Sequence, residues 1–398
     1  MIAPRTLKGF RDFLPKEARK RQYVIKILKD VFESFGFDPI ETPILEYEEI
    51  LAGKYGEEGE KLIYRFEDNG GRRVAMRYDQ TVPLARVISQ YQNELPMPFK
   101  RYQIQPVFRA DKPQKGRYRE FIQCDIDTLG INSAATDAEI IAVVSKAFEN
   151  LNFKNFKILV NNRSVFRDLP TKAIIIIDKL KKIGPEKVKE ELSEKGFDPE
   201  SLTKIQNAPL PDSLKLVLKI AEKMGVDKDK ILFEPTLARG LDYYTGTIIE
   251  VESPDYPTGS LGGGGRYDNL IGMFGNKQIP AVGFSFGFDR VIEAMEELNL
   301  FPKNLETTKV LVTIFSVELA DKSMEIVNNL RSKNINTEIY LDANTKIEKQ
   351  LKYADQKNIP YVILLGPNEV EKKVITLRNM NTREQKTLSI DQLPDELV

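Results

Sequence analysis

The chain has 398 residues, of which 41% are hydrophobic and 30% charged, and its 59 Lys and Arg balance its 59 Asp and Glu. This length predicts two or three domains, and zero net charge gives no whole-chain sign of a nucleic-acid partner. Histidine is absent and Cys124 is the only cysteine. Ser-His-Asp and Cys-His catalysis, histidine-bound zinc, internal disulfides and paired-thiol redox chemistry are therefore excluded.

The N-terminal sequence MIAPRTLKGFRDFLPKEARKRQ is charged and lacks the apolar region of a signal peptide. No apolar run in the sequence approaches the ~20 residues that span a bilayer. We therefore expect a soluble cytoplasmic protein with no membrane partner. Its chemistry must rest on carboxylates, Arg, Lys, Tyr, Gln and backbone groups.

Helices and strands alternate over the first 160 residues. Apolar residues at helical spacing predict a helix over 16–36 that ends at Gly36, and extended chain follows. A hairpin is predicted at 62–77, and a turn into a helix follows at 78–91. Two antiparallel strands with their loop are predicted at 100–129, an amphipathic helix at 134–151 and a strand at 154–160.

The predicted strand over 117–129 has one polar face and one mostly apolar face. Side chains alternate along a strand, so the polar face carries Arg119, Phe121, Gln123, Asp125 and Asp127. One interpretation is a half-buried strand with a solvated face. The other is that a guanidinium, a ring, an amide and two carboxylates together bind a small zwitterion.

The stretch from Lys100 to Arg119 is strongly basic, with seven Lys or Arg and a single acid, Asp111. Such a run is usually a solvated surface. However, Arg109 ends one predicted strand and Arg117 begins the next. Arginines fixed at strand ends are suited to bidentate phosphate contacts.

Residues 166–230 are rich in Lys and Glu at helical spacing and predict a helical insertion, after which the strand pattern resumes at 232–252. The glycine cluster at 259–265 matches neither GxxxxGK[ST] nor GxGxxG. It indicates either a tight irregular loop or backbone that approaches a ligand closely. Arg290 then stands where a predicted strand gives way to a helix, a position also typical of an ordinary surface residue.

The C-terminal segment has a different pattern. Residues 301–308 predict a linker. Beyond it, strands and helices alternate over 309–365 and a hairpin follows, which is typical of a small α/β domain.

Several of these segments together resemble the class II aminoacyl-tRNA synthetases. FRADKPQKGRYREFIQCDID resembles motif 2 of that class, AVGFSFGFDR resembles motif 3, and the first helix with PIETPIL resembles motif 1. RGLDYYTG and GGGGRYDNL are similar to two motifs special to histidyl-tRNA synthetases, and MRYDQTVPLAR and the segment 309–398 also match that family. The similarity covers nearly the whole chain, and 166–230 is its least distinctive part.

The resemblance implies a fold and an activity. The fold is an α+β catalytic domain over 1–305 on a mainly antiparallel sheet, with a helical insertion at about 166–230, and an α/β anticodon-binding domain over 306–398. The activity is ATP-dependent ligation of L-histidine to tRNA(His) through histidyl-adenylate, with release of AMP and pyrophosphate. Mg²⁺ would bridge the ATP phosphates without a dedicated protein site, and motif 1 would form a homodimer.

The resemblance also implies residue roles. Arg109 and Arg239 would stabilise charge during catalysis and contact the histidine. The other histidine-binding residues would be Asp79, Thr81 and Gln123 at the ammonium, Asp127 and Tyr244 at the imidazole, and Tyr243 in the pocket wall. ATP would be bound by Arg109, Asp111, Phe121 and Arg290, and the tRNA acceptor end would meet Gln114 and Arg117. Asp111 stands where many members of the class have Glu.

The two adjacent tyrosines raise a geometric question. Strict alternation places Tyr243 and Tyr244 on opposite faces of a strand. Both line the pocket only if the strand bends or begins late, which Gly240 and Gly246 would permit.

Two alternatives come from other classes of protein. One is a regulatory paralogue that senses histidine for its biosynthesis without aminoacylating tRNA, and the other is a non-enzymatic tRNA-binding sensor. Such chains are expected to lose motif arginines, and the paralogue typically lacks the anticodon-binding domain. Arg109, Arg239, Arg290 and the C-terminal pattern are all present, which favours the synthetase.

Overall fold

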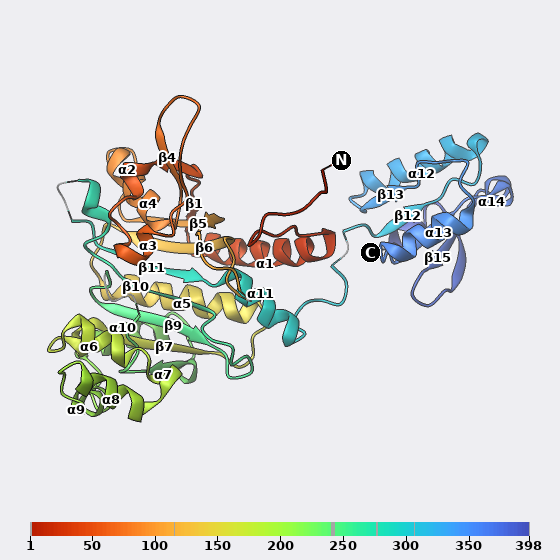
Figure 1. Ribbon diagram of the computed structural model, residues 1–398. Coiled ribbons are helices and arrows are strands. Elements are labelled where there is room, and N and C mark those ends of the chain that lie inside the picture. Colours follow the sequence, from red (N-terminus) through yellow and green to blue (C-terminus); the bar gives the residue numbers. More distant parts are fainter. Residues whose placement is uncertain (1, 115, 240–242, 276–277, 306, 398) are drawn as a thin grey trace. The chain divides into compact units, whose positions relative to one another are not determined.

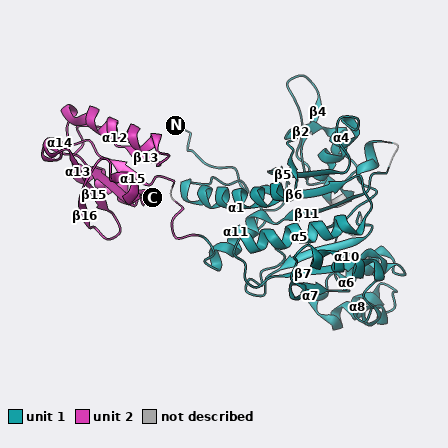
Figure 2. Ribbon diagram, turned by 180° about the vertical axis from the view of Figure 1, so that it is seen from behind, with its two compact units in different colours: residues 1–301 teal, residues 302–398 magenta. Residues whose placement is uncertain are grey.

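The computed structural model describes residues 2–114, 116–239, 243–275, 278–305 and 307–397. The chain divides into two compact units, Met1–Phe301 and Pro302–Val398 (Figure 2). Each unit has its own sheet and its own apolar core. Among the helices described, none combines the length and apolar character needed to cross a bilayer.

An eight-stranded sheet organises the first unit (Figure 1). Its strands, in spatial order, are β1 (Asp38–Pro39), β5 (Phe99–Phe108), β6 (Glu120–Leu129), β11 (Ala281–Phe286), β10 (Gly262–Arg266), β9 (Thr247–Glu252), β7 (Lys157–Asn162) and β8 (Ile231–Phe233). In this part of the described chain the two outermost pairings are parallel and those between them are antiparallel. The predicted mainly antiparallel sheet is therefore confirmed.

Helices cover one face of this sheet and form the main core. They are α1 (Pro15–Ser34), α5 (Ala134–Asn150), α10 (Asp212–Lys223) and α11 (Phe288–Glu297). In α1 the buried residues Val24, Leu28 and Val31 recur at helical spacing. The apolar face of β6 meets the same core through Cys124 and Ile126. The opposite face of β6 is thus left for a site.

A smaller sheet consists of β2 (Leu45–Tyr47), β4 (Arg73–Met76) and β3 (Arg65–Glu67). It lies beside the end of β5, where the Phe108 N–H donates to Arg77 O. Short helices α2 (Glu48–Leu51) and α3 (Gly56–Glu60) and the longer α4 (Thr81–Gln90) accompany it. The hairpin predicted over 62–77 is confirmed, and Asp68 holds its turn by accepting from the Gly70 and Arg72 N–H groups.

The segment after β7 is helical, but it divides between two cores. It contains η1 (Arg163–Phe166), α6 (Thr171–Ile177), α7 (Leu180–Ile183), α8 (Pro185–Glu194), α9 (Glu200–Gln206), α10 and η2 (Lys228–Lys230). Helices α6, α8 and α9 share a separate apolar cluster, whereas α10 packs in the main core with α5.

The second unit is a five-stranded α/β sandwich. Its sheet runs β13 (Thr337–Ile339), β12 (Val310–Val312), β14 (Tyr361–Leu364), β15 (Val374–Asn379) and β16 (Gln385–Ser389). Its helices are η4 (Val317–Leu319), α12 (Ala320–Ser332), α13 (Ile347–Gln356), α14 (Pro367–Lys372) and α15 (Leu393–Leu397). The short helices α14 and α15 are absent from the sequence prediction, which placed a hairpin directly after 365.

Candidate active site

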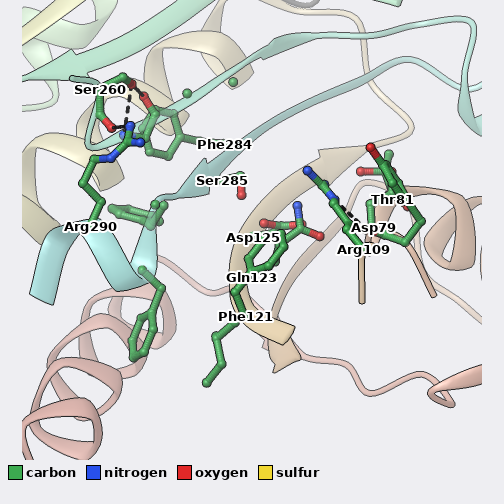
Figure 3. Close-up of a pocket in the computed structure, with 18 of the residues that line it drawn as sticks. Asp79, Thr81, Arg109, Phe121, Gln123, Asp125, Ser260, Phe284, Ser285 and Arg290 are labelled. Carbon is green, nitrogen blue, oxygen red and sulfur yellow. Dashed lines mark hydrogen bonds between the residues drawn. The ribbon is translucent and has the colours of Figure 1, made fainter. Parts of the chain in front are cut away.

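A cavity of about 870 Å³ lies on the polar face of β6 (Figure 3). Most of the site residues predicted from the sequence line it, namely Asp79, Thr81, Arg109, Asp111, Arg117, Phe121, Gln123, Asp127, Arg239, Tyr243, Tyr244 and Arg290. Segments far apart in the chain therefore meet in one place. Gln114 is exposed and is not part of the lining, and Gly240 lies outside the described residues.

Asp127 is held by two partners that the sequence analysis assigned no role. Arg101 stands directly opposite on β5, 2.5 Å from Asp127 Oδ2, and its side chain is buried. Tyr267 donates from its hydroxyl to Asp127 Oδ1. Burial raises the pKa of the Asp127 carboxyl, and Arg101 and Tyr267 oppose that shift. The carboxylate is thus fixed in position at the floor of the cavity.

Asp79 lies at the start of α4, in a loop that a buried arginine anchors. Arg77 donates to Pro106 O at 2.7 Å and Thr42 O at 2.8 Å, which holds the loop against β5. Asp79 Oδ1 accepts from Tyr55 Oη at 2.9 Å and from the Val82 N–H at 3.2 Å. The start of a helix stabilises a carboxylate, although burial still raises the pKa of Asp79.

Arg239 and Arg290 are tied to each other through Ser260. Arg239 Nη1 donates to Glu250 Oε2 at 2.6 Å and to Ser260 Oγ at 2.8 Å. Arg290, in the first turn of α11, donates to the backbone oxygen of Ser260 at 2.8 Å. Ser260 was not singled out by the sequence analysis. It sets the spacing of two guanidinium groups on one wall of the cavity.

Arg109 occupies a different wall. Its Nε donates to Tyr78 O at 3.1 Å, and its guanidinium lies over the rings of Tyr78 and Phe121, at 4.3 and 5.1 Å from their centroids. Stacking on two rings holds a guanidinium plane in a fixed orientation. In the view of Figure 3, Arg109 and Arg290 lie on opposite sides of Gln123 and Asp125.

The glycines of the cluster from Gly262 onward form strand β10 and not an irregular loop. Their missing side chains leave space that neighbouring groups occupy. A Cβ on Gly263 would lie 2.5 Å from the Arg239 guanidinium carbon. A Cβ on Gly264 would lie 2.1 Å from the Gly283 carbonyl oxygen, and one on Gly265 would lie 3.2 Å from the Tyr244 ring. Glycine at these positions lets Arg239 and Tyr244 cross β10.

Both tyrosines line the cavity, with ring centroids 4.5 Å apart at an interplanar angle of 64°. Strand β9 begins only at Thr247, after them. Because the strand starts after the two tyrosines, strand alternation does not apply to them, and both can lie on the same side. Gly246 lies where a Cβ would be 3.0 Å from the Arg266 side chain.

The loop between β5 and β6 closes one end of the cavity. Gln114 and Arg117 exchange backbone hydrogen bonds of 3.1 and 2.9 Å. The Arg117 guanidinium lies 3.8 Å from the carboxylate of Asp111. Arg119, which the alternation placed on the polar face, instead donates to Asp111 O and Lys8 O.

The mainly antiparallel sheet, the helices on one face and the arginine-lined cavity on the other define a class II aminoacyl-tRNA synthetase. A model of the histidyl-tRNA synthetase family matches residues 9–196 and 189–291, and a model of the anticodon-binding domain matches 309–398. The chain belongs to the histidyl-tRNA synthetase family.

Individual relatives agree with this. The histidine–tRNA ligase of Christiangramia forsetii is 41% identical, over 99% of each chain, and that of Cytophaga hutchinsonii is 39% identical, over 100% of each. The crystal structure of histidyl-tRNA synthetase from Nostoc sp. PCC 7120 has a TM-score of 0.89 at 31% identity, covering 100% of this chain and 99% of that one.

Proposed function

We propose that this chain ligates L-histidine to tRNA(His) in two steps at the cavity described above. The histidine carboxylate attacks the α-phosphorus of ATP and pyrophosphate leaves. The terminal ribose hydroxyl of the tRNA then takes the histidyl group and AMP leaves. The observation that carries the proposal is the convergence of Arg109, Arg239 and Arg290 with Asp79 and Asp127 around one cavity.

The first step needs no base from the protein. The attacking group is already an anion, so the absence of histidine from the chain removes nothing that this step uses. Catalysis then consists of in-line positioning and stabilisation of negative charge on the phosphate oxygens. Arg109 and Arg239 serve this purpose, since their guanidinium groups are fixed by Tyr78 and Glu250.

The histidine would bind along β6 and the start of α4. Its ammonium group would meet Asp79, Thr81 and Gln123. Its imidazole N–H would be accepted by Asp127, with Tyr244 beside it. A buried acceptor of this kind rejects side chains that cannot donate to it.

ATP would lie between Phe121, which stacks on adenine, and Arg290, which contacts the phosphates, with Asp111 nearby. In the described ranges no three carboxylates or thiols are arranged to bind a metal ion. Mg²⁺ would therefore reach the site on the ATP phosphates and neutralise part of their charge.

The tRNA would meet two parts of the chain. Its acceptor end would approach Gln114 and Arg117, both exposed in the β5–β6 loop, and its anticodon would bind the second unit. A chain with this activity is expected in the cytoplasm together with tRNA. The regulatory paralogue is not favoured, because Arg109, Arg239 and Arg290 are present in the cavity, as is the region matching the anticodon-binding domain.

The same proposal includes a homodimer formed through the motif 1 region. Large apolar side chains are exposed there on the described surface, including Ile44, Leu45, Tyr47 and Phe66. Exposed apolar residues gathered in one region support an interface. A stable, fully active monomer in light scattering would contradict this part of the proposal.

Histidine-dependent ATP–pyrophosphate exchange and charging of tRNA(His) test the activity. Replacing Arg239 by Ala should cost about 3 kcal/mol of transition-state stabilisation, roughly a hundredfold in kcat. Arg73→Ala is a matched control, because Arg73 also donates to a glutamate, Glu48 at 2.7 Å, but lies outside the cavity. Wild-type protein without histidine-dependent exchange would remove the proposal.

A further inference from the structure

Asp125 is a carboxylate of the cavity that no motif assigned to a ligand. It lies on β6 between Gln123 and Asp127, it is 5% exposed, and it lines the cavity. Its Oδ1 atom is buried and has no hydrogen-bond partner in the described structure. A buried carboxylate oxygen without a partner is costly. Its retention on a cavity wall therefore points to a donor that arrives with the substrate.

The neighbouring acceptors are more fully engaged. Asp127 has Arg101 and Tyr267 as partners, and Asp79 Oδ1 accepts from Tyr55 and the Val82 N–H. Gln123 Oε1 accepts from the Gln80 N–H at 3.1 Å. The side-chain nitrogen of Gln123 can only donate. Gln123 is therefore a weaker receptor for an ammonium group than the carboxylate next to it.

The position of Asp125 selects which substrate group it meets. Alternate residues of a strand are about 6.6 Å apart. If the imidazole lies at Asp127, the other end of a histidine molecule reaches the level of Asp125, one step of this spacing along the strand. Figure 3 shows Asp125 near Gln123 and Ser285, between the Arg109 side and the Arg290 side of the cavity. The three arginines repel a cation, so the ammonium group is directed to the carboxylates.

We propose that Asp125 binds the α-ammonium group of the substrate together with Asp79, and so selects a zwitterionic amino acid over its uncharged analogues. This inference rests on the proposed function. It adds a binding residue that the family motifs leave unassigned. The positive charge of Arg101 then compensates the negative charge of Asp127, and the substrate ammonium compensates that of Asp125.

The electrostatics of the empty cavity agree with this geometry. Burial raises the pKa of Asp125 to about 7, with Asp127 and Asp79 adding to the shift and Arg101 and Ser285 opposing it. A bound ammonium favours the anion, so histidine binding below pH 7 must release a proton. The charged and titratable groups near Asp125 are Arg101 on β5, Cys124 and Asp127 on β6, Asp79 before α4, Tyr243, and Tyr267.

Binding of two ligands to full-length protein at pH 8 tests the inference. The ligands are histidine and its des-amino analogue 3-(imidazol-4-yl)propionate, and the variant is Asp125→Asn. We expect Asp125→Asn to weaken histidine by about 10- to 100-fold and the analogue by less than about threefold. ATP affinity should be unchanged, which also shows that the variant is folded. Glu120→Gln, on the other face of the same strand and outside the cavity, should change neither ligand.

A pH series sharpens the test. The advantage of the wild type over Asp125→Asn for histidine should shrink about tenfold between pH 8 and pH 6, because the free carboxyl is mostly protonated at pH 6. Protonation of histidine itself affects both proteins equally. Equal weakening of histidine and the analogue, or no weakening of either, would overturn the role of Asp125. Wild-type protein that binds no histidine would instead overturn the proposed function.

Discussion

The two units of the chain bury different kinds of polar group. The first unit buries nine charged side chains in the described structure, Arg21, Glu46, Arg77, Arg101, Asp125, Asp127, Asp137, Glu250 and Arg266. The polar side chains that the second unit buries are neutral, namely Thr313, Ser323, Thr337 and Gln350. Both units have apolar cores. Burial of charge is therefore not a requirement of folding, and it is concentrated in the unit that holds the cavity.

The buried charges themselves fall into two groups. Some are matched within the fold, as in Arg266, whose Nε lies 3.1 and 3.2 Å from the two oxygens of Asp137. Asp125 instead faces the cavity, and its Oδ1 atom has no hydrogen-bond partner in the described structure. A buried ion pair seldom stabilises a protein relative to an apolar pair. The unmatched group thus identifies where the fold accepts a stability cost for ligand binding.

Arg101→Met should give the largest change in the free energy of unfolding, because it breaks the ion pair between Arg101 and Asp127 at the floor of the cavity. It leaves Asp127 buried with Tyr267 alone, and we expect the free energy of unfolding to fall by about 3–5 kcal/mol. Urea denaturation of the first unit and histidine binding measure the loss. Adding Asp127→Asn to this variant should recover part of the stability but not the binding. A loss below about 1 kcal/mol would contradict the comparison.

Gln350→Met applies the same replacement to a buried neutral group in the second unit. Gln350 accepts from the Ile314 N–H at 3.0 Å and donates to Ile314 O at 2.8 Å. Gln350 also donates to Thr345 O at 2.7 Å, so three backbone groups would lose this partner. We expect the free energy of unfolding to fall by about 1–3 kcal/mol. Hydrogen exchange over β12 and β14 should report it, while histidine-dependent exchange stays unchanged. A loss larger than that of Arg101→Met would reverse the proposed ordering.

Local patterns in the sequence predicted which residues share one face of a strand and which lie close together. Period-two alternation placed Gln123, Asp125 and Asp127 on one face of β6, and three arginines from separate motifs line the same cavity. The sequence did not identify the residues that hold the site in place, because their roles depend on strand register and packing. Arg101 was counted in a basic run, and its role requires knowing that it lies opposite Asp127.

The glycine cluster and the short helices show the same limit. Four consecutive glycines have weak strand propensity, but β10 forms because β9 and β11 pair with both of its edges. Arg239, Tyr244 and Phe284 occupy the space of its missing side chains. Helices α14 and α15 have six and five residues. They are too short to show a helical period and depend on local caps, such as Glu369 Oε2 accepting from the Gly366 N–H at 3.0 Å.

Asp125→Asn should give the smallest change in the free energy of unfolding, and it should raise this free energy where the other two variants lower it. The pKa of Asp125 is raised from 3.8 to about 7 in the folded protein, so the folded state binds a proton that the unfolded state has released. Wild-type stability therefore falls as the pH rises from about 4 to 7 and is level above that. The amide carries no charge, so the unliganded variant should be about 1–2 kcal/mol more stable than wild type at pH 8 and should lose this advantage towards pH 4.

Saturating histidine separates this effect from simple repacking. Ligand binding should stabilise the wild type more than the variant, because only the wild type gains a carboxylate–ammonium contact. The order of the two melting temperatures at pH 8 should therefore reverse between the free and the histidine-bound proteins. If the variant were less stable than wild type without ligand at pH 8, Asp125 would be a structural carboxylate like Asp137. The contrast between the two units would then reflect packing in the first unit and not the binding of a substrate.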